Sequence, residues 1–281
     1  MEVTTTVPRE WAESPRSGPG RSGVPLLEPR ALEPRAGDFP TRFSEWIGTD
    51  RPVLTFLAAA LGGYVALVAA MVGLGLVLTR VLLRIGSFSA WDEHVNDWLA
   101  AHRTANLEHL SWIGSTLAGG LVIPVVIAFF VVTFLALHHW RLAAFVLFAV
   151  AIESGAYRAT TIFVHRDRPS VDRLESLPID ASFPSGHTAA SIALYGGLLL
   201  LLVSRVGRAP VTVAAWALIA AIPVFVAWAR MYRGMHHVTD SLAGVLLGIG
   251  ALVVIVFATR AAGATADRRD GRERRRERHG A

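Results

Sequence analysis

Six long apolar runs constrain this chain more than any other feature of its sequence. A membrane-spanning helix needs roughly 20 consecutive apolar residues, and most of the runs come near that length. They cover residues 53–79, 110–137, 142–164, 188–204, 210–229 and 241–259. Hydrophobic residues make up 53% of the 281, which is too apolar for an ordinary soluble domain. The sequence therefore predicts an all-α membrane protein with six transmembrane helices.

Two of these runs carry a further constraint. The third contains Glu153 and Arg158, which are costly in hydrocarbon, so we expect both side chains to face the interior of the bundle. The fourth is short, and it spans the membrane only if its helix begins at or before His187.

The segments on either side of the membrane domain, residues 52–260, are predicted to lie in the cytoplasm. Residues 1–51 are rich in Pro, Gly, Arg and Glu and lack apolar periodicity, so we expect disorder. They also lack the features of a secretory signal, so the first run is expected to remain as an uncleaved anchor. Residues 261–281 alternate arginine with acidic residues, which is typical of a solvated tail.

The charged residues and the missing cysteines exclude some classes of chemistry. With no cysteine, disulfides and thiolate metal sites are impossible, so a nucleophile must be His, Ser, Thr or a carboxylate. The net charge is +5, and all 27 basic residues are arginine. Much of the excess follows the last apolar run, where anionic lipid head groups are the natural neighbours. We therefore expect membrane lipids as partners and no nucleic acid.

An amphipathic helix is predicted between the first two spans. Ser89-Ala-Trp-Asp92 has the spacing of a capping box, and Trp91, Val95, Trp98 and Leu99 follow at helical spacing. This pattern is typical of a helix lying in the membrane interface, where tryptophan is an anchor. The two tryptophans could instead form a substrate platform, but we assign them no chemistry.

Arginine placement predicts the orientation of the spans. Both termini are expected in the cytoplasm because the following arginines then fall on the inner side: Arg51, Arg141, Arg205, Arg208 and Arg260. Arg80 and Arg84 lie on the other side and count against this orientation. With six spans, residues 165–186 and 230–240 both emerge on the outer face.

These two outer segments contain the groups that a phosphate ester needs. Such a site requires cations and N–H donors around the phosphoryl oxygens, an in-line nucleophile and an acid for the leaving oxygen. Arg168 and Arg230 come from different segments and can clamp the phosphoryl group with bidentate donors. Ser185-Gly186-His187 stands at the start of the fourth span, where backbone N–H groups form an anion site.

His236 and Asp240 are four residues apart in the second outer segment. If the sixth helix begins near them, this spacing places them on one face, where the carboxylate can hold the imidazole in one tautomer. His236 is then a nucleophile or a base.

Three motifs in these segments resemble those of the type 2 phosphatidic acid phosphatase (PAP2) superfamily. Pro184-Ser-Gly-His187 resembles its second motif, and Arg230-x5-His236-x3-Asp240 its third. Arg168-Pro169 resembles the end of the first. The likeness covers roughly residues 88 to 257, and three ordered motifs are far more specific than one.

The resemblance implies a mechanism and a set of site residues. His236 would attack phosphorus, Asp240 would orient it, and His187 would protonate the leaving group and then activate water. The phosphoryl group would be bound by four residues, namely Arg168, Arg230, Ser185 and Gly186. The family mechanism uses no metal and no other cofactor.

The sequence departs from the family motifs at two positions. Where the first motif begins with lysine, this chain has Thr161, so one phosphate cation is missing. Arg158 lies three residues earlier on the same helical face and is our candidate replacement, and Arg166 could also approach from the loop. Ala229 stands where the third motif usually has serine.

Four further residues in these segments have ordinary explanations: His165, Arg166, Arg233 and His237. An arginine at a membrane interface is usually a head-group anchor, and a histidine there is more often structural than catalytic.

The sequence and the resemblance predict a lipid phosphatase or diphosphatase that takes its substrate from the bilayer. The family and the outward-facing site favour a polyprenyl diphosphate of cell-wall synthesis. Phosphatidic acid, phosphatidylglycerophosphate and phosphorylated sugar-lipids stay open as substrates. A lipid phosphotransferase and a degenerate, non-enzymatic lipid-phosphate-binding protein are the alternatives.

Overall fold

The structure is a computed structural model, and it describes residues 29–176, 181–206 and 209–280. All regular structure in these ranges is helical. Five stretches are long and apolar enough to cross a membrane: α2 with η2 (Pro52–Arg84), α6 (Trp140–Phe163), α7 to α8 (Gly186–Val203), α9 (Ala209–Tyr232) and α10 (Val238–Gly280). The remaining predicted span, the second along the chain, is a pair of helices, α4 (Ala105–Leu117) and α5 (Val122–Ala136), which meet at 42°. The predicted all-α membrane fold is confirmed.

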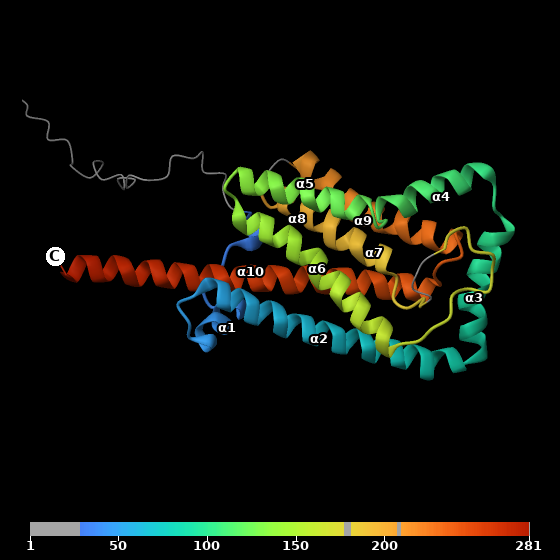
Figure 1. The fold of residues 1–281 in the computed structure, drawn as a ribbon, viewed down its shortest axis with the longest axis horizontal. Helices are drawn as coiled ribbons and strands as arrows, with labels where there is room; N and C mark the ends of the chain where they lie inside the picture. The colour runs from blue at the N-terminus through green and yellow to red at the C-terminus, as the bar shows by residue number, and fades with distance from the viewer. Residues whose placement is uncertain (1–28, 177–180, 207–208, 281) are drawn as a thin grey trace, which may run out of the picture.

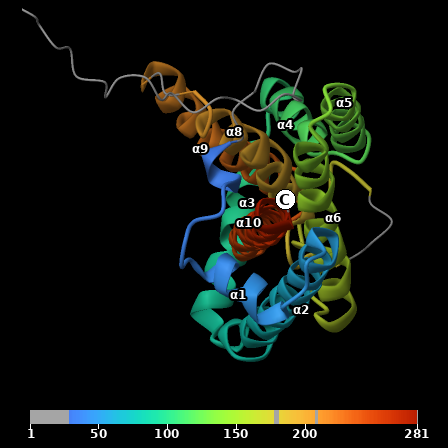
Figure 2. The ribbon, with the colours of Figure 1, turned by 90° about the vertical axis from the view of Figure 1, so that its left-hand side faces the viewer.

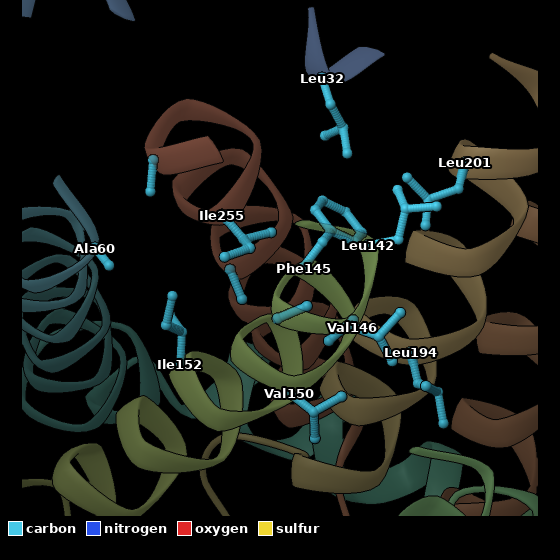
Figure 3. Packing of buried hydrophobic residues seen from close by; sticks show 14 of the residues in the cluster. Leu32, Ala60, Leu142, Phe145, Val146, Val150, Ile152, Leu194, Leu201 and Ile255 are labelled. Atoms are coloured by element: carbon cyan, nitrogen blue, oxygen red, sulfur yellow. The ribbon is translucent and has the colours of Figure 1, made fainter. Parts of the chain in front are cut away.

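Helix α10 is the centre of the bundle, with α2, α6 and α7 packed against it (Figure 2). Small residues allow the close approach. A Cβ on Gly63 of α2 would lie 2.6 Å from Val254, and one on Gly250 would lie 2.5 Å from Leu67. Close backbone contact through glycine is a common way for membrane helices to associate. Figure 3 shows the apolar core beside it, where Phe145 of α6 and Ile255 of α10 are fully buried.

The fourth span is built from three continuous pieces, α7 (Gly186–Ser191), a π-helical turn η3 (Ile192–Gly196) and α8 (Gly197–Val203). It begins at Gly186, so the expectation that it must start at or before His187 is confirmed. From the π turn, the hydroxyl of Tyr195 donates to the Leu117 carbonyl at 2.6 Å. This bond ties the fourth span to the bend between α4 and α5.

The predicted helix between the first two spans is present as α3 (Gly86–Ala101). Trp91 and Trp98 are exposed on it, in keeping with an interfacial anchor. The predicted capping box is wrong, because the helix begins three residues before Ser89. The Asp92 carboxylate is buried and serves the site described below.

Disorder is predicted for residues 1–51, of which residues 1–28 lie outside the described part of the chain. For residues 29–51 the prediction is wrong. A short helix, η1 (Arg30–Leu32), is followed by α1 (Phe39–Ile47), which packs on α10. The tail is a continuation of α10, and its Arg268 donates to the Ser44 hydroxyl and carbonyl at 2.8 and 2.7 Å. These hydrogen bonds and the apolar face of α1 order both segments.

Figure 1 shows α1 and the C-terminal end of α10 at one end of the bundle and α3 at the other. The two segments that carry the sequence motifs lie at the α3 end. One is the connection between α6 and α7, and the other joins α9 to α10. The fold therefore brings the motif residues together, away from α1 and the tail.

Candidate active site

A cavity of about 320 Å³ lies at the meeting point of α5, α6, α7 and the α9–α10 loop. It is lined by both motif histidines, His187 and His236, and by Gly186. Tyr157 and Arg158 of α6 also line it. The structure thus places the predicted nucleophile and the predicted acid on one cavity.

The imidazole of His236 is held in a single tautomer. Its Nδ1 lies 2.7 Å from the carbonyl oxygen of Ser182. Because a carbonyl only accepts, Nδ1 carries the proton and Nε2 keeps its lone pair. The side chain is 2% exposed, and burial together with the positive charges of Arg230 and Arg168 lowers the pKa of His236 well below its usual range, against the opposing effect of Asp240. The result is a neutral imidazole, which is the nucleophilic form.

Asp240 does not hold His236 directly, contrary to the prediction. Its carboxylate accepts from the Ser182 hydroxyl at 2.6 Å, from the His237 N–H at 2.8 Å and from Arg166. The reason is the position of the helix start, since α10 begins at Val238 and His236 precedes it. The i,i+4 geometry of a helix therefore does not relate the two residues. Asp240 instead anchors Ser182, the residue whose carbonyl orients His236.

The Asp240 carboxylate is held in place by an ion-pair chain that ends at Asp92 of α3. Arg166 bridges the carboxylates of Asp240 and Asp92, and all three groups are buried. The Thr239 hydroxyl donates to Asp92 at 2.6 Å. Because both ends of its guanidinium are used in these ion pairs, Arg166 is not a head-group anchor, and that interpretation is wrong. For the same reason Arg166 does not replace the missing motif lysine.

Two more residues of α3 reach the same loop. Asn96 donates from Nδ2 to the His236 carbonyl at 3.0 Å. Glu93 lies 2.9 Å from Nε2 of His237 and accepts from Ser170. Burial alone would raise the pKa of Glu93, but the hydrogen bonds from Ser170 and His237 lower it below its usual range. Sequence reasoning missed these residues, because acidic side chains on an interfacial helix resemble a solvated face.

Arg230 is fully buried beside the cavity, with part of its guanidinium unused. Nη1 donates to the Ser115 hydroxyl and pairs with Glu175. In the described part of the chain, Nε and Nη2 of Arg230 have no hydrogen-bond partner. An unsatisfied buried donor is costly, and an anion would satisfy it. This arginine is therefore placed to receive a phosphoryl oxygen.

Glu175 joins two arginines, since it also pairs with Arg233 at 2.5 Å. Burial would raise the pKa of the Glu175 carboxyl, but Arg230 and Arg233 lower it below its usual range. Arg233 is buried in this ion pair, so the head-group-anchor interpretation is wrong for it as well. Arg168 is buried too and donates to the Met235 carbonyl beside His236.

The Ser185-Gly186-His187 turn contributes backbone donors. The helical ladder begins with the bond from Ala189 N to Ser185 O, so the N–H groups of Gly186 and His187 lie outside it. The Ser185 hydroxyl lies 2.9 Å from that of Thr188, within the protein. A Cβ on Gly186 would lie 3.2 Å from the Tyr157 ring, so glycine keeps this turn close to α6.

Thr161 and Arg158 are oriented differently. The Thr161 hydroxyl donates to the Arg158 carbonyl at 2.8 Å, turned back onto its own helix. The Arg158 side chain lines the cavity together with both motif histidines. Arg158 therefore stays our candidate replacement for the missing lysine.

We expect Arg158→Ala to reduce phosphate release by roughly a hundredfold, the usual effect of removing one group that stabilises an oxyanion. Arg158→Lys should retain part of the activity because it keeps a cation. The measurement is the initial rate of phosphate release at saturating and limiting substrate. Near-normal activity of the alanine variant would remove Arg158 from the site.

Within the described ranges, no three His, Asp or Glu side chains are grouped as they would be around a metal ion. The carboxylates near the cavity are instead bonded to arginine, histidine or hydroxyl groups, as in the pairs of Asp240 with Arg166 and Glu175 with Arg230.

Comparison with known proteins gives a sequence match and a structural match. The family model of the PAP2 superfamily matches residues 142–263, which include every proposed site residue. The fold is similar to the crystal structure of the first transmembrane PAP2 type phosphatidylglycerolphosphate phosphatase from Bacillus subtilis. That likeness has a TM-score of 0.56 at 20% sequence identity, over 74% of this chain and 94% of that one. No curated protein matches the chain.

Proposed function

We propose that this chain, whose residues 142–263 match the family model of the PAP2 superfamily, is a membrane lipid phosphatase that works through a phosphohistidine at His236. The observation that carries the proposal is the shared cavity of His236 and His187, with Nε2 of His236 left as the nucleophile. The unused donors of Arg230 beside His236 support the same reaction.

The proposed reaction has two steps. Nε2 of His236 attacks phosphorus, the bond from phosphorus to the lipid oxygen breaks, and His187 gives its proton to that oxygen. Water then attacks phosphorus, His187 takes a proton from the water, the bond from phosphorus to Nε2 of His236 breaks, and inorganic phosphate leaves. Arg168, Arg230 and the N–H groups after Ser185 stabilise the negative charge in both steps. Asp240 acts as a positioning residue through Ser182.

A second cavity supports a lipid as the substrate. It has a volume of about 470 Å³ and an almost wholly apolar lining, between α5, the η3–α8 segment and α9. On α5, Ile123 lines the first cavity and Val126 and Phe130 line the second. On the fourth span, Ala190 lines the first cavity and Leu198 lines the second. We propose that the hydrocarbon chain of the substrate follows this seam inward from the phosphate.

The substrate is proposed as a lipid phosphate or diphosphate. Polyprenyl diphosphate is the choice that the family and the outward-facing site favour, and phosphatidic acid and phosphatidylglycerophosphate are the glycerolipid alternatives. The arginine asymmetry supports a site on the outer face of the membrane, at the opposite end of the bundle from α1 and the tail.

The test is phosphate release by the purified full-length protein from a panel of lipid phosphates and diphosphates, in excess EDTA. We expect release that is unchanged by EDTA, because no step of the mechanism uses a metal. A competing alcohol, added as phosphate acceptor, separates hydrolysis from phosphotransfer by its products. The proposal fails if no lipid yields phosphate, or if EDTA abolishes release and a divalent ion restores it.

A further inference from the structure

Glu153 is a buried acidic residue on the cavity wall that the mechanism does not use. Its side chain is 1% exposed, within the membrane-spanning part of α6. It lines the cavity that contains His187 and His236. Its carboxyl accepts a hydrogen bond from the Ser154 hydroxyl at 2.9 Å, and no ion pair involves it in the described part of the chain. A carboxyl at such a position is costly and marks function more often than structure.

The depth of Glu153 in the cavity is set by α6. It precedes Tyr157, whose ring packs on Gly186, by one helical turn, or about 6 Å along the helix. Its neighbours on the cavity wall include Ile123, Pro124 and Ala190. Glu153 and Ser154 are therefore the polar groups of an otherwise apolar region, on the membrane side of the phosphoryl position.

The leaving group must pass this region. His236 attacks in line, so the lipid oxygen departs on the side away from His236, near His187. The atoms attached to that oxygen then extend toward the membrane along the wall that carries Glu153. A carboxyl group has oxygen acceptors, and a hydroxyl group is a donor that can satisfy them.

We propose that Glu153 accepts a hydrogen bond from a hydroxyl group of the leaving alcohol, close to the phosphate ester. This inference rests on the proposed function and specifies its substrate class, a lipid phosphate whose leaving alcohol is a glycerol or sugar unit with a free hydroxyl. A polyprenyl diphosphate fits this wall less well, because its leaving group has no hydroxyl there. Sites that hydrogen-bond a substrate hydroxyl discriminate strongly against analogues that lack it.

The experiment compares two substrates that differ in one atom. The first is phosphatidylglycerolphosphate, whose phosphate-bearing glycerol has a free secondary hydroxyl, and the second is the propanediol analogue without that hydroxyl. We expect wild-type kcat/KM to be about 10- to 100-fold higher for the first. Glu153→Leu should remove most of that difference by slowing the first substrate alone, and Glu153→Gln should keep part of it through the amide oxygen.

Thr160→Val is the matched control, a polar-to-apolar change on the same helix. Thr160 is buried, donates to the Ala156 carbonyl and is not a residue of the cavity wall. Thr160→Val should leave the ratio of kcat/KM between the two substrates unchanged. If the wild type is active but treats both substrates alike, or if Glu153→Leu slows both equally, the inference is wrong and the phosphatase proposal stands. If the wild type hydrolyses no lipid phosphate, both are wrong.

Discussion

Replacing His236 with alanine is expected to lower phosphate release by a factor on the order of 10⁴ or more, the scale on which removal of a covalent nucleophile acts. The imidazole is oriented by the Ser182 carbonyl and kept neutral by its surroundings, which prepares Nε2 for attack. The same variant should lose the covalent intermediate. With ³²P-labelled lipid phosphate and an alkaline quench, label should remain on the wild type and be absent from His236→Ala.

His165→Ala provides the comparison for this variant, because His165 is exposed in the connection that follows α6. It should keep wild-type activity and labelling. Retention of a tenth or more of the wild-type rate by His236→Ala would show that another group attacks phosphorus. The two-step mechanism would then have to be abandoned, although the fold and the match to the PAP2 family model would be unaffected.

Replacing His187 with alanine is expected to lower turnover of lipid phosphates by about 10²- to 10⁴-fold, the usual contribution of a general acid or base. The effect should depend on the leaving group. p-Nitrophenolate leaves without a proton, so with p-nitrophenyl phosphate the first step should survive while the water step stays slow. Rapid-quench measurements should then show a burst of one nitrophenolate per enzyme, followed by slow release.

The wild type gives the reference for that burst, since His187 is present there to activate water and its phosphoenzyme should turn over faster than that of His187→Ala. An equal loss of rate for the lipid and the nitrophenyl substrate, without a burst, would argue against His187 as the acid. It would assign His187 to phosphate binding instead. The observation that His187 and His236 line one cavity agrees with either role, so only the kinetics separates them.

The membrane fold could be predicted because apolar length is a strong signal that survives without tertiary information. The start of the fourth span at Gly186 followed from the same argument. The bend in the second span could not be predicted, since its apolar run is continuous and the break at Gly119 and Gly120 depends on packing against Tyr195. Order in residues 29–51 was also missed, because it depends on contacts with the distant end of α10.

The candidate site was predictable where the motifs fix residue types, and not where support comes from another element. His187 and His236 line one cavity, and Arg168 and Arg230 are buried. The partner of His236 could not be deduced, because a shift of the helix start by two residues replaces a carboxylate by a backbone carbonyl. The roles of these residues, the orientation in the membrane and the lipid substrate stay predictions.

Helix α3 faces two environments at once. It exposes Trp91 and Trp98 and holds the nucleophile's loop through Asp92 and Asn96. The protein, rather than the lipid, therefore sets the height above the hydrocarbon at which phosphorus must be presented. A lipid with a long linker between its hydrocarbon chain and its phosphate must bend toward the membrane to reach that level. A lipid with a short linker must move partly out of its leaflet.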